Sequence, residues 1–246
     1  MSLSCFKKVG EFHDVFGHPV LTTPQKNILH ELPKMVPFRF KLIKEEIDEL
    51  KDAIKKHDFI ECIDAICDMM YFIYGTYHVM GVDFDALPQQ PYAIYDKDTN
   101  NFKIFNDDVA VLNSVLKDID LNVNVVDQIV ASVSSTYTTE MYERCFYKVI
   151  HTLDTLEALA HTLASLFGVD IYACFAEVHR SNMTKLCKTE EEAKLTVDKY
   201  NSDPENRYEP AYRQYGGYWV MYNKKDSKII KSMNWELPDL KKVLGL

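Results

Sequence analysis

The stretch that decides the fold is RFKLIKEEIDELKDAIKKHDFIECIDAICDMMYFIYGTYHVMGVD, residues 39–83. In its first half, Ile43, Ile47 and Leu50 recur at the spacing of an amphipathic helix. The second half, after a short polar turn, is apolar on nearly every side, which is typical of a buried helix. The stretch therefore predicts two antiparallel helices, the second of them inside the core.

Each predicted helix also carries carboxylates. In the second helix, Glu61, Asp64 and Asp68 fall on one narrow face, and no lysine or arginine stands four positions away to pair with them. Unpaired buried charge costs several kcal/mol per ion, so a positive partner is expected there. In the first helix, Glu46 and Glu49 lie beside the apolar stripe. Lysines alternate with the acids of that helix, so by itself it also fits a solvated face with ion pairs.

An antiparallel pair would bring the acids of the two helices face to face. Four or more converging carboxylates repel one another and hold protons unless a cation joins them. Mg²⁺ takes carboxylate and water oxygens, and it usually shares them with substrate phosphates. The pattern predicts a Mg²⁺ site, with Mn²⁺ as an alternative ion, that handles a di- or triphosphate.

The motifs EExxE, at residues 45–49, and ExxD, at residues 61–64, resemble those of the all-α nucleoside triphosphate pyrophosphohydrolases. That superfamily includes MazG-like enzymes, dimeric dUTPases and phosphoribosyl-ATP pyrophosphohydrolase. The resemblance implies Mg²⁺-dependent hydrolysis of a nucleoside triphosphate to the monophosphate and pyrophosphate. It implies metal ligation by five residues, with Glu45 as a sixth ligand or a base: Glu46, Glu49, Glu61, Asp64 and Asp68.

Two further segments are similar to one MazG-like branch: GEFHDVFGHP at residues 10–19 and EVHRSNMTKL at residues 177–186. The resemblance implies that Asn182 and Lys185 face the nucleotide. An amide offers a donor and an acceptor to a base or sugar, and an ammonium offers a point charge to phosphate. Arg39 stands where this branch tends to carry Arg, and it is expected either in a surface ion pair or on the phosphates or carboxylates.

One departure concerns Ala65, because some relatives carry an acid there, and the exact ligand set therefore stays open.

Composition narrows the class of protein. The 246 residues are 47% hydrophobic and carry a net charge of −9, which argues against a nucleic acid partner. Six scattered cysteines without a CxxC pair indicate neither a disulfide framework nor a zinc motif. The N-terminus lacks an apolar signal sequence, and the longest apolar stretch, residues 62–81, is interrupted by Asp64 and Asp68. We expect a cytoplasmic protein that does not span a membrane.

We infer a degenerate internal repeat in the middle of the chain, with chance similarity between two amphipathic helical segments as the alternative. Shifting the chain by 87 residues places Ile63 on Ile150 but Asp64 on His151, so packing positions are kept while the acids are lost. Since a lone hairpin cannot bury both sides, we expect an all-α, four-helix-bundle-like core in which the second hairpin walls the site in cis. A site shared by two chains of a homodimer is the alternative.

The rest of the chain is expected to form one domain, residues 1–246, in three parts. Residues 1–87 hold an N-terminal helix and the acidic hairpin, and residues 88–170 hold a loop and the repeat hairpin. Residues 171–246 hold the nucleotide-contacting helix and a small C-terminal β-hairpin. Within this last part, residues 188–214 look irregular, and the hairpin is expected to turn near residues 224–227.

Alternative functions remain at this stage. A phosphoribosyl-ATP pyrophosphohydrolase or a dUTPase/dCTPase-type enzyme would use the same metal chemistry with a different base pocket. A non-catalytic helical interaction protein would use both hairpins only for packing. Sequence does not identify the base, nor does it separate removal of damaged nucleotides from control of a normal pool.

Overall fold

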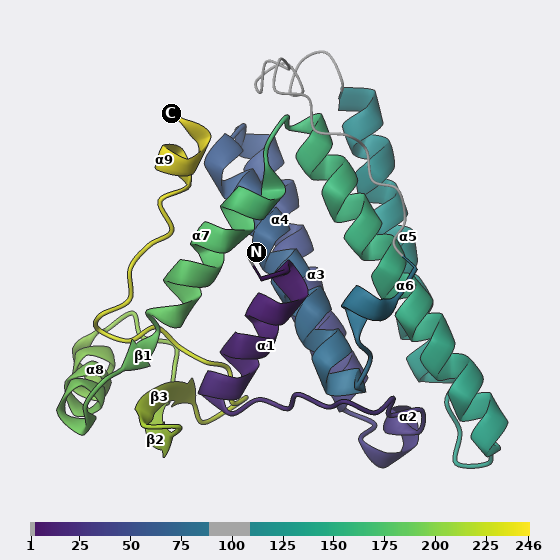
Figure 1. The fold of residues 1–246 in the computed structure, drawn as a ribbon, viewed down its shortest axis with the longest axis horizontal. Coiled ribbons are helices and arrows are strands. Elements are labelled where there is room, and N and C mark those ends of the chain that lie inside the picture. Colours follow the sequence, from purple (N-terminus) through teal and green to yellow (C-terminus); the bar gives the residue numbers. More distant parts are fainter. Residues whose placement is uncertain (1–2, 89–108) are drawn as a thin grey trace.

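The computed structural model describes residues 3–88 and 109–246 and is mainly helical. Helices α3 (Met35–Lys56) and α4 (Phe59–Met80) form the predicted antiparallel hairpin. Helices α5 (Val109–Ser132) and α6 (Thr139–Leu166) form a second hairpin beside it (Figure 1). Together they make the expected four-helix core. Most of the predicted loop at residues 88–108 lies outside the described residues.

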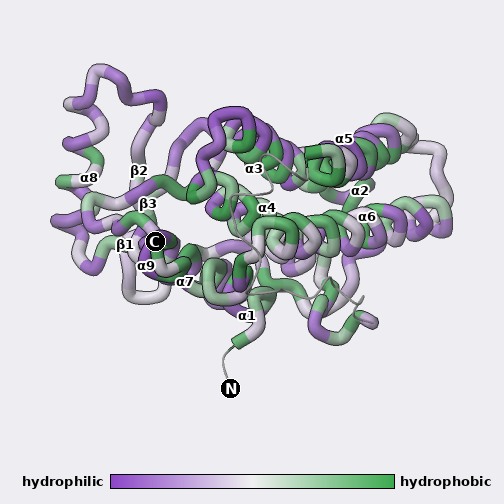
Figure 2. The backbone as a smooth tube through the Cα atoms, turned by 90° about the horizontal axis from the view of Figure 1, so that it is seen from above, coloured by the Kyte–Doolittle hydropathy of each residue, from purple (hydrophilic) through white to green (hydrophobic). Residues whose placement is uncertain are grey.

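Helix α4 is the centre of the molecule. It is enclosed by α3, by α6, by α1 (Cys5–Phe16) and by α7 (Ile171–Met183), and Figure 2 shows it in the middle of the helical layer. Large side chains such as Tyr77, Ile66 and Met69 are fully buried. This confirms the prediction that a helix apolar on nearly all sides belongs inside the core.

Local sequence accounts for the ends of α4. The Asp58 side chain accepts a hydrogen bond from the Glu61 amide and so caps the first turn. The helix ends at Gly81 with a φ of 70°, a left-handed conformation that glycine adopts without strain. A Cβ at this position would stand 1.9 Å from the Thr23 carbonyl oxygen, so the neighbouring backbone requires glycine as well.

The second hairpin is present, but the single shift of 87 residues is wrong for its first helix. The shift would place α3 on residues 122–143, which include the connection between α5 and α6. It does place α4 within α6, and the turn after each helix matches. Gly81 and Gly168 both have positive φ, and Asp83 and Asp170 both cap the helix that follows. The second hairpin can therefore pack like the first although its first helix does not align under this shift. A core tolerates different apolar sequences as long as its total volume and hydrophobic pattern are kept.

The C-terminal part differs from the prediction in two ways. Residues expected to be irregular form α8 (Glu190–Ser202), which Thr189 and Glu192 cap reciprocally, and β2 (Pro210–Tyr215). Strand β3 (Tyr218–Asn223) pairs with β2 across a Gly216–Gly217 turn, and on its other edge with β1 (Leu186–Cys187). Beyond residues 224–227 only a single bridge, Tyr222 to Ile229, forms. The main hairpin turn therefore lies at the two glycines, which adopt positive φ readily.

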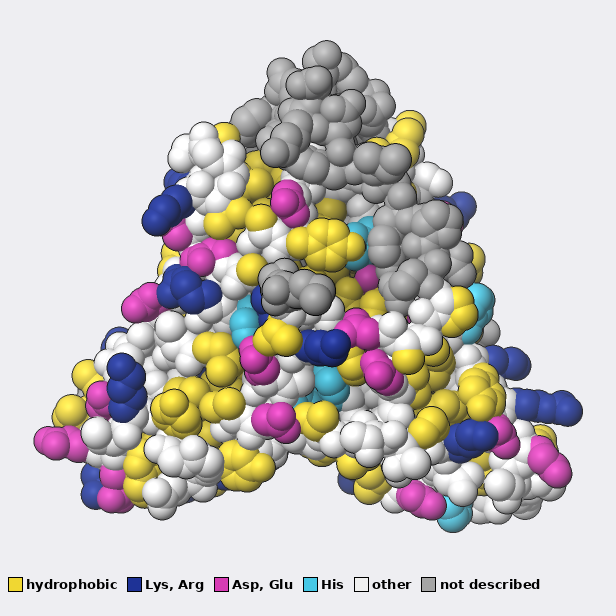
Figure 3. All heavy atoms as spheres, viewed as in Figure 1, with side chains coloured by type: hydrophobic (Ala, Val, Ile, Leu, Met, Phe, Trp, Pro, Cys, Tyr) yellow, Lys and Arg dark blue, Asp and Glu magenta, His cyan; other side chains and the backbone are white. Residues whose placement is uncertain are grey.

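Three short helices complete the described residues: α2 (Ile28–Glu31), the 3₁₀ helix η1 (Phe84–Ala86) and α9 (Leu240–Leu244). Among the helices described, none by itself has both the length and the apolar composition of a membrane span. Helices α6 and α7 pass such a test only as a pair, and they are bent by 109° where they join. On the face drawn in Figure 3, lysine and arginine side chains lie scattered among acidic and hydrophobic ones.

Candidate active site

The two helices of the first hairpin bring their carboxylates together. Glu46 is 7% exposed. Burial raises its pKa to about 9, and the nearby Asp68 and Glu49 carboxylates act in the same direction. Glu49 lies on the exposed rim, where partial burial, then Glu61 and Asp68, raise its pKa. The acids of α3 and α4 therefore share one electrostatic site.

Asp64 and Asp68 occupy the α4 side of this site, and both are half-buried. Burial, followed by the charges of Asp68 and Glu61, raises the pKa of Asp64 to about 7. The Oδ1 atom of Asp64 is buried and has no hydrogen-bond partner among the described residues. A buried oxygen without a donor is costly, so this position is suited to a ligand that supplies positive charge.

Glu45 and Glu61 lie at the edges of the site. The Glu45 carboxylate is 3.6 Å from Lys41 Nζ and 3.4 Å from Lys228 Nζ. Glu61 is exposed in the first turn of α4, close enough to raise the pKa of both Glu49 and Asp64. Within residues 3–88 and 109–246, Glu45 alone of the predicted acids forms ion pairs.

Asn182 and Lys185 approach the site from α7, although only Asn182 belongs to the helix. Helix α7 ends at Met183, and the Lys185 amide donates to the Asn182 carbonyl in the turn that follows. Asn182 is buried beside Tyr71. Burial lowers the pKa of Lys185, while Asp68 raises it. The expected helical spacing of the two residues was wrong, yet both lie near α4, Asn182 beside Tyr71 and Lys185 close to Asp68.

Arg39 lies apart from the carboxylates, about two helical turns before Glu46. Its guanidinium is buried, and it donates to Thr76 Oγ1 over 3.2 Å and to the Phe72 carbonyl over 3.1 Å. Gly75 makes room for it, because a Cβ there would stand 2.1 Å from Arg39 Nη2. Burial lowers its pKa to about 10. The expected surface ion pair is therefore wrong, and a contact with substrate stays a prediction.

Two residues of the site were missed in the sequence. Lys228 and Lys231 follow β3, and both lie close enough to oppose the raised pKa of Asp68, as Lys185 does. Locally they belong to the segment NKKDSKIIK, which was predicted to form the turn and the following strand of a β-hairpin over residues 218–232. No local signal marks these two lysines, because only the fold brings them to residues more than a hundred positions earlier.

The site fits a divalent cation in donor type and in charge. All five predicted ligands carry hard carboxylate oxygens, which Mg²⁺ prefers, and Asp64 Oδ1 is left without a partner. Within the described ranges, 3–88 and 109–246, no three acidic, histidine or cysteine side chains converge closely enough to hold an ion. Ion binding therefore requires side-chain rotation, which Glu49 and Glu61 can undergo because they are exposed.

Comparisons with known proteins agree with this geometry. The family model of phosphoribosyl-ATP pyrophosphohydrolase matches residues 9–90, which include α1 and the acidic hairpin. The chain is also 32% identical over 247 residues to "Uncharacterized protein L479" of Acanthamoeba polyphaga mimivirus, covering 97% of this chain and 95% of that protein. No solved structure matches the chain.

The helical hairpin with facing carboxylates and the matching family model together define the class. Residues 9–90 belong to the phosphoribosyl-ATP pyrophosphohydrolase family of the MazG-like superfamily. Over nearly its full length, the chain is in one family with the mimivirus protein. The first hairpin lies within the matched residues, and the match supports a hydrolase as the class of protein.

Proposed function

We propose that this protein hydrolyses a nucleoside triphosphate to the monophosphate and pyrophosphate in a Mg²⁺-dependent reaction. The observation that carries the proposal is the set of carboxylates shared by α3 and α4, in which Glu46 is buried beside other acids and Asp64 Oδ1 has no hydrogen-bond donor among the described residues. Carboxylates in this state bind divalent cations, and Mg²⁺ in proteins is usually shared with substrate phosphates. Lysines stand opposite, where a polyphosphate would bridge the two sets of charges.

The residues that would hold Mg²⁺ are Glu46, Glu49, Glu61, Asp64 and Asp68. When bound, the ion polarises phosphate oxygens and lowers the pKa of a water nucleophile. Glu45 is the carboxylate best placed to orient and deprotonate that water, because it stands at the edge of the site. Its ion pairs with Lys41 and Lys228 limit its rotation.

The groups from the end of α7 would bind the substrate. Lys185 would bind phosphate oxygens, since it is half-buried beside Asp64 and Asp68. Asn182 would offer its amide to the base or sugar. All of these residues come from one chain, which supports a site completed in cis, with the second hairpin bracing α4 from behind. Assembly into a homodimer stays a prediction.

Phosphoribosyl-ATP is the specific alternative substrate, because the family model that matches the acidic hairpin carries that activity in its name. It would use the same carboxylates, with a second pocket for the added phosphoribosyl group. Deoxyuridine and deoxycytidine triphosphates are further candidates from the same superfamily. House-cleaning of modified nucleotides is the physiological role that we propose to test first.

The decisive experiment is a substrate panel with pyrophosphate detection at saturating Mg²⁺. The panel contains the common and modified nucleoside triphosphates, dUTP, dCTP and phosphoribosyl-ATP. We expect pyrophosphate release from at least one compound, and its loss when EDTA removes the metal. If no compound releases pyrophosphate with either Mg²⁺ or Mn²⁺, the proposal is wrong and a non-catalytic helical interaction protein is favoured.

A further inference from the structure

The segment after β3 crosses the molecule from the small sheet to α7, and we name residues 228–237 the strap. Its beginning is fixed to β3, where the Ile230 amide donates to the Met221 carbonyl over 3.2 Å. Its middle is fixed to α8, because the Tyr200 hydroxyl donates to the Lys231 carbonyl over 3.0 Å. The strap is therefore held by backbone contacts on either side of its lysines.

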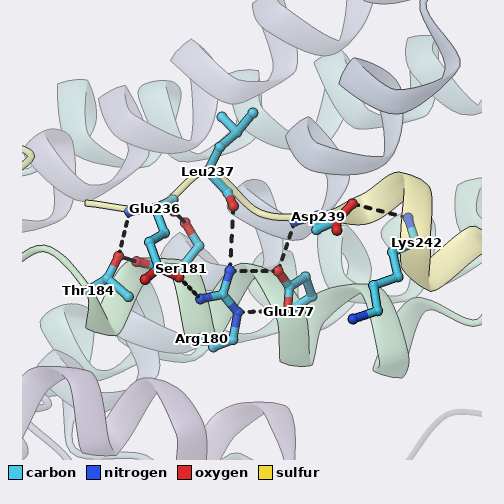
Figure 4. A network of polar contacts seen from close by, with 8 residues as sticks. All are labelled: Glu177, Arg180, Ser181, Thr184, Glu236, Leu237, Asp239 and Lys242. Atoms are coloured by element: carbon cyan, nitrogen blue, oxygen red, sulfur yellow. Dashed lines mark hydrogen bonds and ion pairs between the residues drawn. The ribbon is translucent and has the colours of Figure 1, made fainter. Parts of the chain in front are cut away.

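The end of the strap is fixed to α7. The Glu236 amide donates to Thr184 Oγ1 over 2.9 Å, and Ser181 Oγ donates to the Glu236 carbonyl over 2.6 Å. Arg180 bonds both Glu236 and Glu177, and Figure 4 shows these contacts joining α7 to the chain that leads into α9. The strap thus shares a rigid frame with the turn that carries Lys185.

This frame gathers three ammonium groups opposite the acids. Neither Lys185 nor Lys231 forms an ion pair with a carboxylate within the part of the chain that the structure describes. Both nevertheless lie close enough to Asp64 and Asp68 to oppose the raised pKa of each. Lys228 Nζ lies 3.4 Å from a Glu45 carboxylate oxygen, which places the start of the strap directly beside the acids of α3. Cations of the strap and carboxylates of the hairpin therefore adjoin, an arrangement that suits a ligand with negative charge together with a bound cation.

Trp235 fixes the position of Lys231. The Lys231 ammonium lies 3.6 Å from the centroid of the Trp235 ring, well inside the range of a cation–π interaction. The Trp235 ring nitrogen is buried and without a hydrogen-bond partner among the described residues, as is Asp64 Oδ1. Two buried polar atoms that lack partners thus belong to residues near Lys231, which points to a polar ligand in this region.

We propose that the strap is the phosphate-binding wall of the site, in which Lys228 and Lys231 join Lys185 on the oxygens of a polyphosphate. Trp235 is the positioning residue for Lys231. This inference rests on the proposed function, because it takes the acids opposite as the metal side of the same site. It adds to that function a substrate-recognition role for a segment that the sequence presents as a surface turn.

The test uses the full chain with Mg²⁺ and inorganic tripolyphosphate as the probe, measured by titration calorimetry. We expect Lys231→Gln and Lys228→Gln each to weaken binding about tenfold, the scale of one charge-assisted hydrogen bond. Both variants should also show a weaker dependence on ionic strength. The matched control is Lys224→Gln, an exposed lysine of the same turn, which should bind like the wild type.

The role of Trp235 needs a readout other than stability. Trp235→Leu should weaken tripolyphosphate binding as much as Lys231→Gln, and Trp235→Phe should restore most of the affinity because a ring remains. In a Lys231→Gln background, Trp235→Leu should have no further effect on affinity. Equal and additive losses from the two substitutions would overturn the positioning role.

The outcomes separate this inference from the proposed function. If the wild type fails to bind tripolyphosphate, or if both lysine variants bind like the wild type, the strap proposal is overturned. Pyrophosphate release from a nucleotide would still stand in that case. Conversely, lysine-dependent tripolyphosphate binding without hydrolysis of any nucleotide would support the strap and overturn the proposed function.

Discussion

The two helical hairpins bury carboxylates in opposite ways. In the second hairpin, Glu157 is 2% exposed, accepts a hydrogen bond of 2.7 Å from the Tyr74 hydroxyl, and lies 3.0 Å from His161 Nε2. In the first hairpin, Glu46 and Asp64 are buried among other acids instead. A buried acid with donors is part of the packing, whereas buried acids that face one another require a cation from outside.

Asp154 extends the comparison. Burial raises its pKa, but the Tyr77 hydroxyl donates to it and lowers the pKa again. Each of these two acids of α6 meets a tyrosine of α4, so the hairpin without the metal motif still uses carboxylates, as acceptors inside the core. The chemistry of a buried acid is therefore decided by its neighbours across the helix interface.

The largest effect is expected from Asp68→Asn, which removes one charge from the shared site and keeps the side-chain shape. Turnover in the pyrophosphate assay should fall about a thousandfold or more, because a preorganised charge of the site is lost. The melting temperature should stay equal or rise, since repulsion among the acids decreases.

The control for that variant is Asp52→Asn. Asp52 is exposed on the same hairpin and pairs only with Lys55 among the described residues. It should leave turnover unchanged. Equal turnover in Asp68→Asn and the wild type would contradict the comparison, because the acids of the first hairpin would then not serve the reaction.

A stability effect of the next size is expected from Glu157→Ala in the second hairpin. Removing this acceptor takes away the hydrogen bond from the Tyr74 hydroxyl and the contact with His161 Nε2, and the free energy of unfolding should fall by about 3 kcal/mol. Urea denaturation measures the loss. Turnover below the melting temperature should be retained, and a stable but inactive variant would show that this hairpin also serves the reaction.

A smaller effect concerns pH in the metal-free protein. Glu46 keeps its proton up to about pH 9 when folded, against a usual value of 4.5, so the folded state binds more protons between these values. Stability must then fall as pH rises through that window. From pH 7 to 9, in EDTA, we expect the wild type to lose on the order of 2 kcal/mol.

Glu46→Gln should remove most of that slope, because glutamine does not titrate. Urea denaturation of both proteins at pH 7, 8 and 9 provides the measurement. If the free energy of unfolding falls equally with pH in both proteins, Glu46 does not titrate differently in the folded and unfolded states. That result would contradict the comparison of the hairpins.

Much of the fold was predictable because it depends on local patterns. The apolar spacing of α3 and the all-round apolar surface of α4 are local, and the structure confirms the two helices that they predict. The caps at Asp58 and Gly81, which the structure shows, are local as well. The α8 helix was missed although Thr189 and Glu192 form a capping box, because the surrounding charge was read as an exposed loop. The β2–β3 turn was predicted at residues 224–227 but lies at Gly216 and Gly217. Both segments have the composition of a turn, so composition did not decide between them.

The residues of the site also divide into those that local sequence predicts and those that depend on tertiary contacts. The acids were found because their spacing on two helices is visible in the chain, and antiparallel packing then sets them face to face. Lys228, Lys231 and Trp235 were not found. For Arg39, neither the surface ion pair nor the contact with phosphates or carboxylates anticipated its buried place beside Gly75. These positions depend on contacts between segments far apart in sequence, for which no periodicity exists.

Sequence alone determined the helical hairpin, its buried second helix and the one face on which the negative charge collects, because helix geometry converts spacing into direction. Only the tertiary structure decided which acids have donors and which lysines stand opposite them. The physical reason is that the fate of a buried charge is set by distances of a few ångströms to groups from other elements. Those distances exist only once the strap, α7 and the two hairpins have packed together.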